Sequence, residues 1–485
     1  MSLRQQAISG VGWTTFAKVI QQGSQFILSI FLMRLLSPDA YGLLGMAMVF
    51  IGFANIFKEF GFGSALVQRS QLAESHYSST FFLNIAIGVF LTILFIVIAP
   101  LLSMFYGSQE LILILQILAL DFTVASVGIV PRSVLQRKMR FDLLSKINIT
   151  TAIIPGVIAV FFALTGIGIW ALVIQTLLVT VFNTVLYLIF APWKPQWLFS
   201  WRSVKQLWAY SANLTGFQFV NYWARSADDL LIGKYMGSAS LGNYTRAYTL
   251  MLLPIKQVIS VVNRVMFSAL SKIQREKDRV KRAYLKSMQL IAFISFPMMI
   301  GLFVVAEPFV LSLFGEKWSG VIPLIQILAW VGVTQALCNP TGWIYQSQGK
   351  TDWMFLWGIF GSGSLVIAII IGVWFGSAKS VAISYAIVNI LITYPCIAIP
   401  GSLINMSFWD VIKVVSPSLI ISGVMGAIVY STTFLIGGLG IHLLLFFQIL
   451  TGFLAYITLA YVFNLKAFNE LQQIVKGYYS EGIFQ

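Results

Sequence analysis

The chain has 485 residues, of which 58% are hydrophobic and 10% are charged, and its formal net charge is +15. Soluble domains carry about 25% charged residues, so this composition excludes an ordinary soluble domain. In a soluble protein the positive charge would indicate nucleic-acid binding. Lys and Arg also collect in the cytoplasmic loops of membrane proteins, so we expect no nucleic-acid partner here.

Apolar runs of about 20 residues recur along the whole length, which predicts an all-α integral membrane protein. We expect about fourteen transmembrane helices, at residues 13–33, 41–57, 79–102, 111–130, 144–165, 168–190, 210–233, 244–267, 285–313, 321–343, 353–375, 380–400, 411–435 and 440–463. The first run is interrupted by Lys18 and several glutamines, so we do not interpret it as a cleavable signal peptide.

The first twelve spans form two similar sets of six. Residues 34–44 match residues 234–244 at an offset of 200, and residues 116–119 match residues 326–329 at an offset of 210. Six is an even number, so both sets enter the membrane with the same polarity, which predicts parallel repeats about an axis along the membrane normal. The predicted organisation is an N-terminal six-helix lobe (1–190), a cytoplasmic interfacial linker (191–209), a C-terminal six-helix lobe (210–400), and two additional transmembrane helices with a cytoplasmic tail (401–485).

The basic residues predict the orientation. With a cytoplasmic N-terminus, 22 of the 31 Lys and Arg residues fall in inside loops, at the chain ends or within three residues of the inside end of a span. Four fall in outside loops, and five fall elsewhere within or at the edges of spans. This asymmetry places both termini in the cytoplasm. The linker carries four tryptophans among basic residues, a composition typical of the membrane interface.

Three expected spans carry their polar residues on one face, within an arc of about 100° on a helix. The faces consist of Thr14, Lys18, Gln21, Gln22, Gln25 and Ser29 in the first span; Gln218, Asn221, Arg225, Asp228 and Asp229 in the seventh; and Arg246, Thr249, Lys256, Gln257, Ser260 and Arg264 in the eighth. A charge in hydrocarbon costs about 2.5–3.5 kcal/mol, so these residues must face water, a partner or a substrate.

The strongest substrate-binding candidates are the cations and amides of these faces: Lys18, Gln22, Gln25, Gln218, Asn221, Arg225, Arg246, Lys256 and Arg264. Asp228 and Asp229 are candidates for coupling or for an ion pair with Arg225, since residues three and four apart meet on a helix. Two alternatives to substrate binding remain open. In one, the faces serve helix–helix contacts; in the other, Arg246 and Arg264 extend to the membrane–water interface. Asp121 and Glu307 are the other acids within spans, with either a transport role or a structural one.

No catalytic residue, metal site or cofactor is expected. Cys338 and Cys396 both fall in expected spans and indicate neither a disulfide framework nor a metal centre. His76 and His442 are too few and too far apart for a histidine-based site.

Four segments resemble a known transporter family. They are RLLSPDAYG (34–42), GFGSALVQ (61–68), LQRKMRF (135–141) and RSADDLLIGKYMGSASLGNYTRAY (225–248). They are similar to the polysaccharide-transport family of the multidrug/oligosaccharidyl-lipid/polysaccharide exporter superfamily, and within it to the colanic-acid-exporter-type branch. The resemblance covers nearly the whole chain.

The resemblance implies a flippase of the bacterial inner membrane. Its cargo would be an oligosaccharide repeat unit on an undecaprenyl pyrophosphate carrier, moved by two lobes that rock around a central cavity. It implies contacts with membrane lipids, a polysaccharide polymerase as a candidate partner, and a monomeric transporter. The alternatives are a drug exporter of the same superfamily, a peptidoglycan-precursor flippase, and a membrane polysaccharide polymerase. The first span carries Lys18 and no acid, which argues against a site for cationic drugs.

Overall fold

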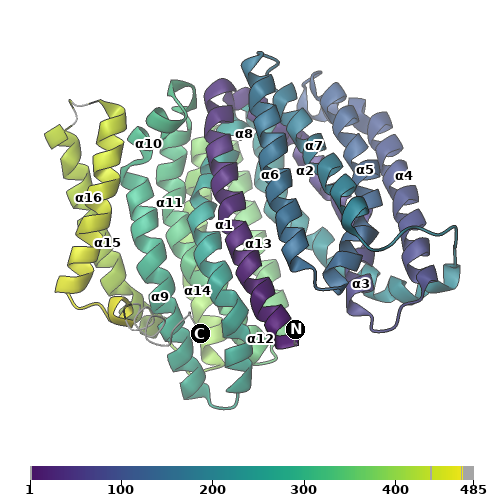
Figure 1. Ribbon diagram of the computed structural model, residues 1–485. Coiled ribbons are helices and arrows are strands. Elements are labelled where there is room, and N and C mark those ends of the chain that lie inside the picture. The colour runs from purple at the N-terminus through teal and green to yellow at the C-terminus, as the bar shows by residue number, and fades with distance from the viewer. Residues whose placement is uncertain (1–2, 437, 439, 471, 473–485) are drawn as a thin grey trace. The chain divides into compact units, whose positions relative to one another are not determined.

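The computed structural model of the protein describes residues 3–436, 438, 440–470 and 472 (Figure 1), and among these residues there is no strand. The helices are α1 (Leu3–Leu35), α2 (Pro38–Glu59), α3 (Phe62–Gln68), α4 (Glu74–Tyr106), α5 (Leu111–Arg137), α6 (Phe141–Leu164), α7 (Trp170–Phe190), α8 (Trp201–Lys272), α9 (Lys277–Val304), α10 (Ala306–Leu313), η1 (Glu316–Trp318), α11 (Val321–Cys338), η2 (Asn339–Thr341), α12 (Gly342–Ser347), α13 (Thr351–Trp374), α14 (Ala378–Ser402), α15 (Phe408–Ile436) and α16 (Ile441–Val462). The all-α class predicted from the sequence is confirmed.

Eleven helical segments among the described residues are long and apolar enough to cross a membrane. The three remaining expected spans, 13–33, 210–233 and 244–267, lie in α1 and α8. These are the helices that carry the polar faces. The expected ninth span is divided into α9 and α10, and the expected tenth continues through α11, η2 and α12 as far as Ser347.

Local sequence signals set several helix ends. Ser37 caps α2 by accepting a hydrogen bond from the Ala40 N–H at 3.4 Å, and Pro38 supplies the first residue of the helix. Gly107 ends α4 in the left-handed conformation, with φ 72°, and its N–H donates to the Ser103 carbonyl at 2.8 Å.

The helix α8 joins the expected seventh and eighth spans and has 72 residues. It consists of two helical segments that meet at Gly237, whose φ of 79° and ψ of 177° are not helical. Glycine tolerates this backbone conformation because it has no Cβ atom. The expected loop between the two spans is therefore a single break in a helix.

The chain divides into two compact units, Met1–Gly242 and Asn243–Gln485. The first unit holds α1–α7 and the beginning of α8, and the second holds the rest of α8 and α9–α16. The boundaries of the expected lobes rest on the sequence duplication and stay a prediction.

In the first unit, α1 lies along α6, α4 packs on α5, and α5 packs on α7. A Cβ atom at Gly156 of α6 would lie 2.3 Å from a methyl carbon of Leu28 on α1, so the two helices approach closely there. One core cluster includes Phe62, Phe81 and Val130.

The beginning of α8 is held on α2. Tyr222 Oη donates to the Val49 carbonyl at 2.5 Å, and the ring of Phe53 contacts that of Trp223 at 4.9 Å. The preceding segment, 191–200, is not helical and packs on α4, where Trp193 Nε1 donates to Glu74 Oε1 at 2.5 Å. Trp197 is 93% exposed, so it lies on the surface of the unit.

In the second unit, α15 packs on α9 and α16, and α11 packs on α9 and α14. Its core cluster includes Phe293, Ile300, Met425 and Tyr456. Tyr456 Oη donates to the Phe293 carbonyl at 2.7 Å, so a polar group in this apolar region is satisfied internally.

Candidate functional site

The polar face of α1 is accessible where the structure describes it. Lys18 and Gln25 are exposed and Gln22 is half-buried, whereas the side chains before Lys18 lie outside the described part of the helix. The helix α1 is long enough to span a membrane, and Lys18, Gln22 and Gln25 form a hydrophilic strip along it.

The first segment of α8 carries an exposed Gln218 and an exposed Arg225. Asp228, nearly one turn further along, is buried, and its Oδ1 accepts the backbone N–H of Asp229 at 3.0 Å. Both acids have further interactions, and none of the ion pairs described joins either of them to Arg225. The side chain of Asn221 lies outside the described set.

The second segment of α8 belongs to the second unit from Asn243 onward. Lys256 is exposed and follows Pro254 by two residues, and Arg246 is half-buried and engaged in interactions of its own. The side chain of Arg264 is not among those described. The predicted residues are thus distributed over both units, and each unit presents an exposed cation on α8.

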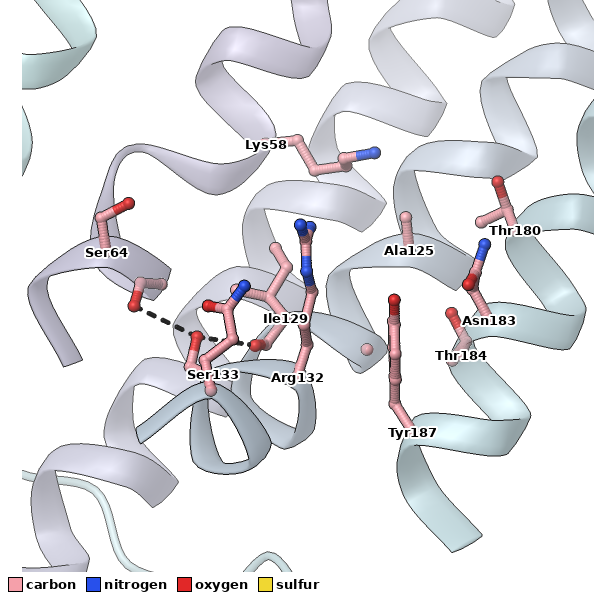
Figure 2. A pocket seen from close by; sticks show the side chains of 13 residues that line it. Lys58, Ser64, Ala125, Ile129, Arg132, Ser133, Thr180, Asn183, Thr184 and Tyr187 are labelled. Carbon is pink, nitrogen blue, oxygen red and sulfur yellow. Dashed lines mark hydrogen bonds between the residues drawn. The ribbon is translucent and has the colours of Figure 1, made fainter. Parts of the chain in front are cut away.

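A polar cavity lies inside the first unit (Figure 2). It has a volume of about 260 Å³, and we call it the first-unit cavity. Its lining residues come from α2, α3, α5 and α7: Lys58, Gly63, Ser64, Ala125, Gly128, Ile129, Arg132, Ser133, Gln136, Thr180, Asn183, Thr184 and Tyr187.

A buried ion pair borders this cavity. Lys58 Nζ lies 3.2 Å from Asp121 Oδ2, and the two side chains are 11% and 9% exposed. Thr180 Oγ1 donates to the other carboxylate oxygen, Asp121 Oδ1. The carboxylate of Asp121 therefore accepts from donors on two neighbouring helices. This fits a structural role for Asp121, one of the two roles that the sequence left open. Lys58 lies in the last turn of α2, where the helix dipole favours a cation.

Close helix approaches shape the cavity wall. Gly128 of α5 faces α7, and a Cβ atom there would lie 3.0 Å from Thr184 Oγ1. That hydroxyl donates to the Val124 carbonyl at 3.1 Å. Ser133 Oγ donates to the Gly63 carbonyl at 3.1 Å and so ties α5 to α3.

Sequence reasoning missed Lys58. The expected second span ended at residue 57, so Lys58 was assigned to a cytoplasmic loop, whereas α2 continues to Glu59. A signal was present, because Asp121 is an acid in an apolar span and a buried acid needs a partner. Glu307, the other acid, is exposed in the first turn of α10, where the helix dipole stabilises a carboxylate.

Residues 31–323 match the family described as polysaccharide biosynthesis protein. The chain belongs to this family. It is 32% identical to the teichuronic acid biosynthesis protein TuaB of Bacillus subtilis (strain 168), over 80% of this chain and 81% of the relative. It is 27% identical to the lipopolysaccharide biosynthesis protein WzxC of Escherichia coli (strain K12), over 88% and 89%. It is also 27% identical to the succinoglycan biosynthesis transport protein ExoT of Rhizobium meliloti (strain 1021), over 78% and 77%.

Solved structures show the fold. The lipid II flippase MurJ in an inward closed conformation superposes with a TM-score of 0.71 at 17% identity, covering 94% of this chain and 98% of that one. An inward-facing multidrug resistance MATE transporter of the MOP superfamily superposes with a TM-score of 0.61 at 16% identity, covering 82% and 98%. The predicted polysaccharide family and the fold are confirmed. The protein is a multi-pass membrane transporter of a polysaccharide biosynthesis family, and the polymerase alternative is wrong.

Proposed function

We propose that this protein is a flippase for an oligosaccharide repeat unit linked to undecaprenyl pyrophosphate. The cargo moves from the cytoplasmic to the periplasmic leaflet of the bacterial inner membrane by alternating access, for exopolysaccharide or capsule synthesis. Family membership and the relatives named for polysaccharides support this cargo class.

One structural observation carries the proposal: three cations on membrane-length helices are exposed. Lys18 on α1 and Arg225 and Lys256 on α8 are exposed, although a charge in hydrocarbon is costly. A strongly hydrated anionic head group that crosses the membrane needs such cations, together with hydrogen-bonding amides such as Gln25 and Gln218. The lipid tail can remain in the bilayer while the head group crosses.

The proposal assigns the polar faces as the substrate path. Its binding residues are Lys18, Gln22, Gln25, Gln218, Asn221, Arg225, Arg246, Lys256 and Arg264, and Asp228 and Asp229 serve in coupling or in an ion pair. Both termini are placed in the cytoplasm by the distribution of basic residues. A peptidoglycan precursor on the same carrier is the second candidate cargo, favoured by the likeness to the lipid II flippase fold.

The test is reconstitution of the full chain into liposomes that contain a lipid-linked oligosaccharide with a fluorescent sugar. A membrane-impermeant quencher added outside reports which leaflet holds the sugar. Protein-dependent exchange between leaflets supports a flippase, and a parallel assay with lipid II identifies the cargo. Protein-dependent efflux of a cationic dye, with neither lipid moved, would establish a drug exporter instead.

A further inference from the structure

We propose that the first-unit cavity binds a single anionic, hydroxylated sugar group, either a sugar acid or a sugar phosphate. The inference rests on the proposed function, because it names a chemical feature of the glycan cargo. It adds a site inside the first unit to the polar faces of α1 and α8.

The charges that line the cavity favour an anion. Lys58 and Arg132 line it, and no Asp or Glu is among the lining residues. The nearby carboxylate of Asp121 already accepts from Lys58 and Thr180. An ammonium group has three donors and a guanidinium group has five, so these cations can donate to a bound anion as well. Charge-assisted hydrogen bonds of this kind are the strong ones.

The amide of Asn183 favours a ligand that also carries hydroxyl groups. Its Nδ2 donates to the Val179 carbonyl at 2.8 Å, which fixes the orientation of the amide. Its Oδ1 is buried and accepts no hydrogen bond from the described residues. A buried acceptor of this kind requires a donor. A sugar hydroxyl supplies one, whereas the dianion of a phosphate monoester has no O–H of its own to donate.

The cations come from α2 and α5 and not from α7. Figure 2 shows Thr180, Asn183 and Tyr187 on one helix and Lys58 and Arg132 on others. The α7 side thus offers an amide and hydroxyls without a charge, whereas the cations of α2 and α5 stand beside further polar groups from Ser64, Ser133 and Gln136. A ligand with hydroxyls on one edge and an anionic group on the other matches this division.

The size limits the ligand to about one sugar ring. Pockets for small molecules usually measure about 300–1,000 Å³, and this cavity, at about 260 Å³, lies just below that range. A whole repeat unit does not fit, and the polar lining disfavours a prenyl tail. The lining residues of α2, α5 and α7 lie toward the C-terminal end of each helix, which the proposed topology places at the cytoplasmic side, where the cargo is made.

The test uses the full chain, purified in detergent, and measures ligand binding by calorimetry and by thermal unfolding. The ligands are glucuronate, glucose 1-phosphate, glucose and inorganic phosphate. The variants are Arg132→Gln and the double change Lys58→Met with Asp121→Asn, which removes the ion pair without leaving a lone buried charge. Lys138→Gln, at an exposed cation on the same side of the unit but outside the lining, is the matched control.

We expect one or both hydroxylated anions to bind at least about tenfold more tightly than glucose or inorganic phosphate. Arg132→Gln and the double variant should each weaken this binding about tenfold or more, and Lys138→Gln should not change it. Binding of glucuronate alone identifies a sugar acid as the source, and binding of glucose 1-phosphate alone identifies a phosphate.

The proposal is overturned if neither anion binds, if inorganic phosphate binds as tightly as they do, or if Arg132→Gln leaves binding unchanged. Transport is measured separately in the liposome assay. Selective sugar binding without leaflet exchange would contradict only the proposed flippase function. Leaflet exchange without sugar binding would contradict only the proposed binding site in the first-unit cavity.

Discussion

Gly42 and Gly242 occupy equivalent positions in a reciprocal contact. A Cβ atom at Gly42 would lie 1.7 Å from the Ser238 carbonyl oxygen, and one at Gly242 would lie 1.9 Å from the Pro38 carbonyl oxygen. Pro38 and Ser238 are 200 residues apart, and so are the two glycines, which matches the offset of the repeat. In an isologous contact, residue i meets residue j and j meets i, as a two-fold relation requires.

Alanine at either position of this contact should be severely destabilising. The obstructing atoms are backbone carbonyls, which cannot rotate away as a flexible side chain would. We expect Gly42→Ala and Gly242→Ala to cost more than the usual 1–3 kcal/mol of overpacking and to abolish accumulation of folded protein. Size-exclusion profiles and thermal unfolding in detergent measure this loss.

Gly358→Ala in α13 is the control, because no atom lies within 4 Å of the added Cβ. It should leave the profile and the unfolding temperature nearly unchanged. An unchanged unfolding temperature of Gly42→Ala would show that α2 and α8 are free to separate at this contact.

The buried pair of Lys58 and Asp121 gives a second prediction. Lys58→Met should destabilise the protein by about 3–5 kcal/mol, because it leaves the Asp121 carboxylate buried without its cation. Adding Asp121→Asn should restore most of this loss, since a neutral amide costs far less to bury. A double-mutant cycle of thermal unfolding measures the coupling. Additive losses would mean that the pair contributes no specific interaction.

The exposed cations of α8 give the third prediction. Arg225→Ala and Lys256→Ala should each slow leaflet exchange about tenfold or more, since a charge-assisted contact contributes about 1.5–3 kcal/mol. Arg225→Lys should be mild if only charge matters and severe if a bidentate phosphate contact is needed. Initial rates in the liposome assay measure the effect, and Lys138→Ala is the control that should be tolerated.

A further variant separates substrate binding from ion pairing at Arg225. Arg225→Ala combined with Asp228→Asn should remain as impaired as Arg225→Ala alone if Arg225 contacts the cargo. Full recovery of exchange in the double variant would instead identify Arg225 as a partner of the acid, and Lys256 would be the remaining candidate.

The fourth prediction concerns orientation. In a variant without Cys338 and Cys396, a cysteine at Gln109, between α4 and α5, should react with an impermeant thiol reagent in spheroplasts. A cysteine at Gln274, between α8 and α9, should react only after the membrane is opened. Both glutamines are exposed and neutral, so the pair is matched in chemistry. The reverse labelling pattern would invert the topology.

The sequence predicted the membrane class and most of the spans, because these are properties of local order. The repeat and the role of the polar faces stay predictions. Hydropathy depends on consecutive residues, and the faces of α1 and α8 follow from helical periodicity alone. The superfamily was recognised from short segments such as residues 34–42. Lys58 was missed through a local error of two residues in the end of α2.

Only the tertiary structure decided which groups meet. Lys58 and Asp121 are 63 residues apart, and their pairing depends on the packing of α2 against α5. The first-unit cavity likewise needs four helices, and only their packing shows that no described residue donates to the buried Oδ1 of Asn183. A sequence specifies which face of each helix is polar, but helix packing determines which polar faces enclose a site. That packing depends on small contacts between distant residues, such as Gly128 against Thr184, so local patterns do not reveal it.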